Sequence, residues 1–124
     1  MADTTKERDV SGAVGPYTPI VRAGEWLVVS GQVGLGADGL ADGLSAQVTQ
    51  AVANLRGLLE SEGAALNDVV KTTVFLTDME DYAAMNDAYT AAFGDHRPAR
   101  SAVAVAALPI GALVEVEAWA RIGG

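Results

Sequence analysis

The sequence contains no cysteine, so disulfide bonds, thiolate catalysis and cysteine-ligated metals are excluded. Histidine is almost absent as well, since His96 is the only one. A Ser-His-Asp triad would have to use this residue, and a transition metal would find a single imidazole ligand. Because His96 lies in Gly94-Asp95-His96-Arg97-Pro98, between an expected helix and an expected strand, we interpret it as a surface loop residue.

Basic residues and long apolar runs are scarce. Eight Lys and Arg stand against sixteen Asp and Glu, which gives a formal net charge of −8. An acidic surface repels phosphate backbones and disfavours a nucleic-acid partner. No apolar run is long enough to span a bilayer, and the charged N-terminal segment lacks the apolar region of a secretory signal. We therefore expect a cytoplasmic protein with no membrane partner.

Charged residues make up only 19% of the sequence, whereas apolar residues make up 50%. A length of 124 residues predicts a single domain, 1–124, in which the polar residues 1–11 are expected to be loose. The low charged fraction favours an oligomer that covers part of the surface.

The hydrophobic periodicity predicts an α+β protein with one mixed sheet and two helices on one face. Helices are expected at about 45–62 and 81–93, and strands at 25–30, 69–76, 100–107 and 112–121, after an extended segment at 17–22. The glycine-rich residues 31–43 are expected to form a loop or hairpin. The last two strands are expected to pair as a hairpin, and the uncovered sheet face is expected to be wet or an interface around a site.

Two motifs receive a structural interpretation. Residues 34–39 match G-x-G-x-x-G, the pattern of a dinucleotide-binding loop. No helix is expected to open there and the second half of a dinucleotide-binding fold is missing, so we interpret these glycines as part of a hairpin turn. Asp78, Glu80 and Asp81 surround the start of the second helix, where they complement its dipole, and Asp78 could cap it.

Arg100 and Glu115 have more functional potential. A guanidinium grips a carboxylate through two hydrogen bonds, but an arginine near a strand end can also simply extend to solvent. Glu115 lies between Val114 and Val116 and could be a general base that activates water or an outward-facing carboxylate. Pairing through a turn at 108–111 would place it on the strand beside Arg100.

At these residues the sequence resembles the RidA family (also called YjgF/YER057c) of reactive-imine deaminases. The likeness runs from Gly15 to Ala120. The matching segments are Gly15-Pro16-Tyr17; Val29-Ser30-Gly31-Gln32; QAVANL at 50–55; VVKTTVFL at 69–76; Met85-Asn86 with Tyr89; Pro98-Ala99-Arg100-Ser101; and Leu108-Pro109 followed by Val114-Glu115-Val116-Glu117.

This resemblance implies a chorismate-mutase-like α+β fold and a homotrimer with sheets inside, helices outside and a cleft at each subunit boundary. It implies hydrolysis of 2-imino acids such as 2-iminopropanoate and 2-iminobutanoate to 2-oxo acids and ammonia, with no cofactor and no metal. The family's arginine, carboxylate and tyrosine fall on Arg100, Glu115 and Tyr17. Positions that line or support the pocket fall on Ser30, Asn86 and Ala102.

The sequence departs from the family pattern at three places. Thr18-Pro19 stands where Ser-Gln is usual, Ala102 where a cysteine is common, and residues 33–43 are unusually rich in glycine. Pro19 lacks a backbone donor beside the expected pocket. Two alternatives therefore stay open: a relative specialised for another imine, and a non-catalytic member that binds a small acid or acts as a chaperone. A ribonuclease is disfavoured by the acidity and by the absence of a histidine pair.

Overall fold

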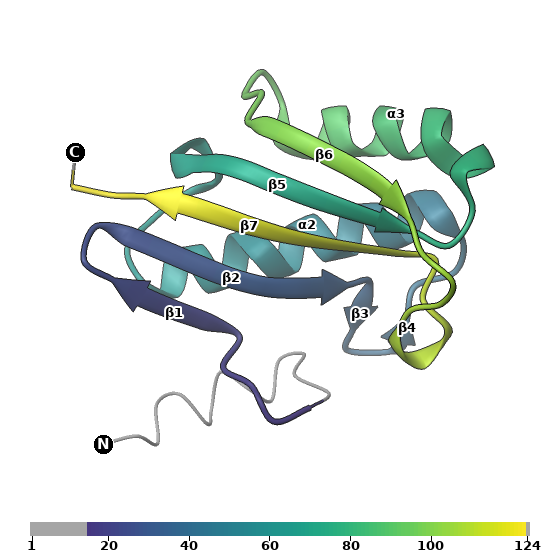
Figure 1. Ribbon diagram of the computed structural model, residues 1–124, viewed down its shortest axis with the longest axis horizontal. Coiled ribbons are helices and arrows are strands. Elements are labelled where there is room, and N and C mark those ends of the chain that lie inside the picture. Colours follow the sequence, from purple (N-terminus) through teal and green to yellow (C-terminus); the bar gives the residue numbers. More distant parts are fainter. Residues whose placement is uncertain (1–14, 124) are drawn as a thin grey trace.

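The computed structural model describes residues 15–123, so the expectation for residues 1–11 lies outside the described residues. Five strands form one mixed sheet in the order β1-β2-β7-β5-β6 (Figure 1). The strands are β1 Ile20–Ala23, β2 Trp26–Val33, β5 Val69–Leu76, β6 Ala99–Ala104 and β7 Val114–Arg121. The short 3₁₀ turns are η1 Leu66–Asp68, η2 Met79–Asp81 and η3 Pro109–Gly111.

Two helices, α2 (Leu44–Ser61) and α3 (Tyr82–Phe93), cover one face of this sheet (Figure 1). The predicted apolar stripe of α2 is fully buried: Val48, Val52, Leu55 and Leu59 are at most 1% exposed. Packing of this stripe against β2 and β7 supplies most of the helix's stability. None of the helices in residues 15–123 is long and apolar enough to span a membrane.

The strand order corrects one sequence prediction. β6 does not pair with β7 as a hairpin; it pairs in parallel with β5, and β7 lies between β5 and β2. Parallel neighbours need a crossover, and α3 provides it between β5 and β6. The segment after β6 then runs past the end of β5 and turns back to start β7 on the far side of β5 (Figure 1).

Residues 35–40 of the glycine-rich segment form a hairpin, one of the two forms that the sequence predicts. Strands β3 (Leu35–Gly36) and β4 (Gly39–Leu40) pair across a two-residue turn. A Cβ on Gly34 would lie 2.5 Å from the Cα of Gln47, so this glycine lets β2 run closely past α2. The G-x-G-x-x-G match thus shapes a turn, and no helix opens behind it.

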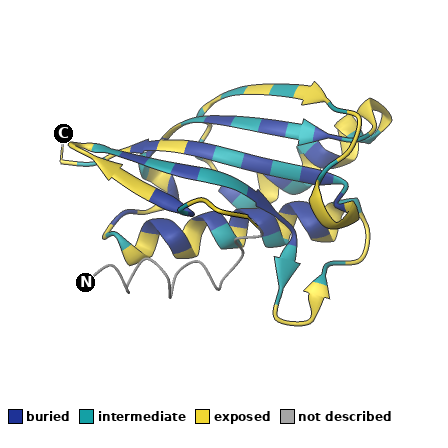
Figure 2. Ribbon diagram, turned by 60° about the horizontal axis from the view of Figure 1, so that its bottom comes forward, coloured by how far each residue is buried: buried dark blue, intermediate teal, exposed yellow. Residues whose placement is uncertain are grey.

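In the part of the chain that the structure describes, no helix covers the sheet face opposite α2 and α3, and this face is partly apolar. The central strands alternate between buried and half-buried residues, whereas the edge strands β1 and β6 are mostly exposed (Figure 2). On β7 the predicted alternation holds: Val114, Val116, Ala118 and Ala120 are buried, and Trp119 is 46% exposed. Trp119 packs edge-on against Trp26, with ring centroids 6.1 Å apart.

Candidate functional site

A pocket of about 430 Å³ opens beside Glu115, and we call it the Glu115 pocket. Three segments far apart in the sequence converge there: the turn before β1, the middle of β2, and the η3 turn with β7. It is lined by Gly15, Pro16, Tyr17, Ser30, Gly31, Pro109 and Glu115. Three of the residues singled out from the sequence, namely Tyr17, Ser30 and Glu115, therefore share one cavity within one chain.

The carboxylate of Glu115 is half-buried and, within residues 15–123, has no hydrogen-bond or ion-pair partner. Burial raises the pKa of this carboxyl above its usual value of 4.5, and the negative charge of Glu117 raises it further. A carboxylate with a raised pKa accepts a proton from water more readily than an ordinary one. The surroundings of the Glu115 carboxylate therefore suit a general base.

Gly31 makes room for this carboxylate. The pairing of β2 with β7 shifts register between Val29 and Gln32, which is a β-bulge at Ser30 and Gly31. A Cβ on Gly31 would contact the Oε2 of Glu115 and lie 2.6 Å from its Cδ. The absence of a side chain at Gly31 therefore leaves the space that the Glu115 carboxylate occupies.

We predict that Gly31→Ala displaces Glu115 without unfolding the protein, because the clashing atoms end a flexible side chain. Turnover of the substrate proposed below should fall by about tenfold or more, as misplaced groups react slowly. The matched control is Gly57→Ala in α2, whose new Cβ would meet nothing within 4 Å. Ammonia-release rates and thermal midpoints of both variants check this. Full activity in Gly31→Ala would remove Gly31 from the site.

Ser30 and Pro19 hold the pocket wall together. Both the backbone N–H and the hydroxyl of Ser30 donate to the carbonyl oxygen of Pro19, at 2.8 Å and 3.1 Å. Pro19 lacks an N–H, but its carbonyl is the group used here. The sequence departure at Thr18-Pro19 therefore leaves this contact in place.

Arg100 lies elsewhere, against α3. Its Nη2 donates to the Tyr82 hydroxyl at 3.2 Å, and its Nη1 lies 3.7 Å from the Met85 sulfur. The guanidinium carbon is 5.0 Å from the ring centroid of Tyr89 and 5.6 Å from that of Tyr82. No carboxylate of residues 15–123 forms an ion pair with Arg100.

Within one chain, Arg100 and Glu115 lie on opposite faces of the sheet. Arg100 is in register with Thr72, which is buried against Tyr89 on the helix side. Glu115 is in register with Phe75, three residues further along β5, and successive side chains alternate faces. β5 also separates their strands by roughly 10 Å. The expectation that they lie on neighbouring strands is therefore wrong.

The other two expected pocket residues belong to the Arg100 side. Asn86 follows Met85 on α3, and its Oδ1 is buried without a hydrogen-bond partner among residues 15–123. Ala102 on β6 packs partly buried against the core. The expected site residues thus form two groups: Tyr17, Ser30 and Glu115 in one, and Arg100, Asn86 and Ala102 in the other.

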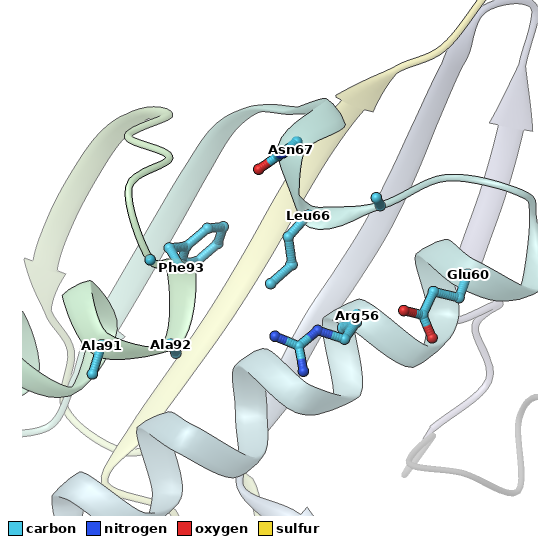
Figure 3. Close-up of a pocket in the computed structure, with 9 residues that line it drawn as sticks. Arg56, Glu60, Leu66, Asn67, Ala91, Ala92 and Phe93 are labelled. Atoms are coloured by element: carbon cyan, nitrogen blue, oxygen red, sulfur yellow. The ribbon is translucent and has the colours of Figure 1, made fainter.

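A second hollow, of about 420 Å³, lies between the helices, and none of the expected site residues lines it (Figure 3). Arg56 and Glu60 project from α2 below Leu66, and Phe93 lies across from Leu66 at the end of α3 (Figure 3). Within residues 15–123, no three histidine, aspartate or glutamate side chains gather closely enough to hold a metal ion.

His96 and Asp78 have structural roles. The Nε2 of His96 lies 2.8 Å from the carbonyl oxygen of Val69, so it donates and ties its loop to the start of β5. The predicted loop position is correct, but the ring is half-buried. Asp78 caps η2 by accepting from the Glu80 N–H at 2.9 Å, and η2 leads directly into α3.

The neighbours of both groups could not be predicted from the sequence. Tyr82, Met85 and Tyr89 recur at helical spacing, but nothing in the sequence connects them with Arg100. The spacing of three and four residues is visible in the sequence, but the arginine that packs against these α3 side chains comes from another element, β6. Pro109 was also not expected to line the Glu115 pocket.

The comparison with known proteins covers nearly the whole chain. Residues 8–122 match the family described as Endoribonuclease L-PSP. Two relatives are named 2-iminobutanoate/2-iminopropanoate deaminase. The Salmonella typhimurium protein is 38% identical over 125 residues, covering 97% of this chain and 98% of its own. The Mus musculus protein is 42% identical over 126 residues, covering 99% and 91%.

The chain belongs to this family. Solved structures agree with the sequence comparison. RidA from a Psychrobacter species superposes with a TM-score of 0.86 at 42% identity, covering 90% of this chain and 92% of the other. The YjgF product of E. coli gives 0.86 at 36% identity, covering 93% and 94%. The resemblance to RidA proteins and the mixed sheet with two helices are thereby confirmed.

Proposed function

We propose that the protein hydrolyses 2-imino acids to 2-oxo acids and ammonia, in sites built from two copies of the chain. One observation carries this: an unpaired carboxylate with a raised pKa and an arginine without an acidic partner lie on opposite faces of the sheet. The two groups are complementary but cannot meet within one chain. The names of the relatives supply the substrate class.

In this proposal Arg100 of one copy holds the substrate carboxylate with its planar fork, so the imine carbon faces the Glu115 pocket of the next copy. Glu115 accepts a proton as the oxygen of water bonds to that carbon, and the proton passes to nitrogen. The hydroxyl proton of this adduct then moves to the same nitrogen, and the C–N bond breaks as the C=O bond forms, which releases ammonia and leaves the 2-oxo acid. Tyr17 closes the pocket and hydrogen-bonds the substrate or the water. Ser30, Asn86 and Ala102 shape and support the site.

The open sheet face supports a ring of copies, specifically a homotrimer with a chorismate-mutase-like fold. Val21, Val103 and Trp119 are all more than 40% exposed, and large side chains of this kind favour a covered surface. The two groups of site residues are different patches of one chain, so the contact is heterologous and can close by rotation. A trimer then carries three equal sites. Light scattering that gave a monomer mass at micromolar concentration would contradict this arrangement.

The direct test supplies freshly generated 2-iminopropanoate and 2-iminobutanoate and follows ammonia and 2-oxo acid together. We expect equal amounts of both products, faster than the uncatalysed hydrolysis. A parallel assay with single-stranded RNA tests the endoribonuclease activity that the name of the matching family implies. The net charge of −8 and the engagement of His96 with the Val69 carbonyl disfavour cleavage. RNA cleavage without ammonia release would replace the proposal, and no turnover with retained 2-oxobutanoate binding would indicate a binding protein.

The pH profile offers a further prediction. Glu115 must be ionised to act as a base, so the rate should rise with pH through the pKa of Glu115. Because the charge of Glu117 contributes to raising that pKa, Glu117→Gln should move the acid limb of kcat to lower pH. Steady-state rates across the acid range measure this shift. An unmoved or upward-moved limb would show that another group controls the profile.

A further inference from the structure

The Arg100 guanidinium packs against three side chains of α3. Nη2 donates to the Tyr82 hydroxyl, Nη1 lies against the Met85 sulfur, and the rings of Tyr82 and Tyr89 lie within 6 Å of the central carbon. These partners are neutral. They restrain the guanidinium without cancelling its charge, whereas a carboxylate partner would do both.

The two tyrosines differ in what else they do. Tyr89 is buried, and its hydroxyl shares a 2.7 Å hydrogen bond with Thr72, so it belongs to the core. Tyr82 is 41% exposed at the first position of α3. Within residues 15–123 its hydroxyl has one hydrogen bond, which it accepts from Arg100. Core packing explains Tyr89 but leaves the exposed Tyr82 unexplained.

We propose that Tyr82 is a positioning residue for Arg100, a role that rests on the proposed function. Its hydroxyl fixes the direction of Nη2 and its ring supports the guanidinium plane. The fork is then already oriented when a substrate carboxylate arrives, and less freedom is lost on binding. An arginine at the exposed edge strand β6 would otherwise sample many rotamers.

The kinetic test compares Tyr82→Phe, which keeps the ring, with Tyr82→Leu, which loses ring and hydroxyl. We expect KM for 2-iminobutanoate to rise about threefold in Tyr82→Phe and about tenfold in Tyr82→Leu, with kcat within about twofold of wild type. Thr90→Ala, an exposed change on the same helix, is the control and should leave both parameters unchanged. In an Arg100→Lys background, Tyr82→Leu should cause little further loss of kcat/KM.

A second readout is independent of turnover. Nitrogen relaxation of the Arg100 Nε–H group should show an ordered side chain in wild type and in Thr90→Ala, and a mobile one in Tyr82→Leu. An equally ordered arginine in Tyr82→Leu would overturn the proposal, as would the same loss of kcat/KM with and without Arg100. If wild type releases no ammonia, the proposed function fails, and the relaxation measurement still decides the role of Tyr82.

Discussion

Arg100→Lys should be nearly as damaging as Arg100→Ala, with kcat/KM for 2-iminobutanoate reduced by about a hundredfold. Lysine keeps the positive charge but loses the planar fork that holds a carboxylate in one orientation. It also cannot reproduce the paired contacts of Nη1 and Nη2 with Met85 and Tyr82. Ammonia release measured at a series of substrate concentrations checks the prediction.

The matched control is Arg121→Lys. Arg121 is also a strand arginine, but it is exposed and forms an ion pair with Glu25 at 2.7 Å. Exposed pairs of this kind contribute little to stability, so activity and thermal midpoint should stay close to wild type. If Arg100→Lys keeps its activity within a few-fold of wild type, charge alone is what matters at this position.

Glu115→Gln should lower turnover by about a hundredfold or more while binding of a 2-oxo acid survives. Glutamine keeps the shape and the hydrogen-bonding reach of the side chain but cannot accept the proton from water. The anchor Arg100 is untouched, and removal of a negative charge beside a bound anion could tighten binding. Calorimetry with 2-oxobutanoate and ammonia release on the same preparation separate the two effects.

Two outcomes would change the assignment of Glu115. Unchanged turnover in Glu115→Gln would show that it is not the base. A parallel loss of binding and turnover would show that Glu115 acts by orienting Arg100 across the subunit boundary. The raised pKa of Glu115 arises from burial and from the charge of Glu117. The assignment of Glu115 as the base therefore also requires that Glu117→Gln moves the acid limb of kcat to lower pH.

Local features of the fold could be predicted well from the sequence. The stripe of α2 follows the helical period, β5 begins and ends where the β-branched run does, and β7 alternates as a half-covered strand should. Arg100 and Glu115 were also identified individually, because a charged residue among small apolar strand residues is conspicuous.

Strand order and the division of the site could not be predicted in the same way. The turn at 108–111 follows one strand and precedes another, and nothing local shows that β7 pairs with β5 and β2 instead of with β6. The exposure of Tyr82 is a similar case, because it shares the helical spacing of Met85 and Tyr89. Only the position of β6 beside α3 shows that Tyr82 contacts Arg100.

The most direct test of a site shared between copies mixes two inactive variants. Arg100→Ala and Glu115→Gln are denatured together in equal amounts and refolded, and ammonia release is compared with each variant alone. If one copy supplies Arg100 and the next supplies Glu115, random assembly restores about a quarter of the wild-type rate, because one site in four receives both intact groups. If both groups act within one chain, every site carries one defect, and the mixture stays as inactive as its components.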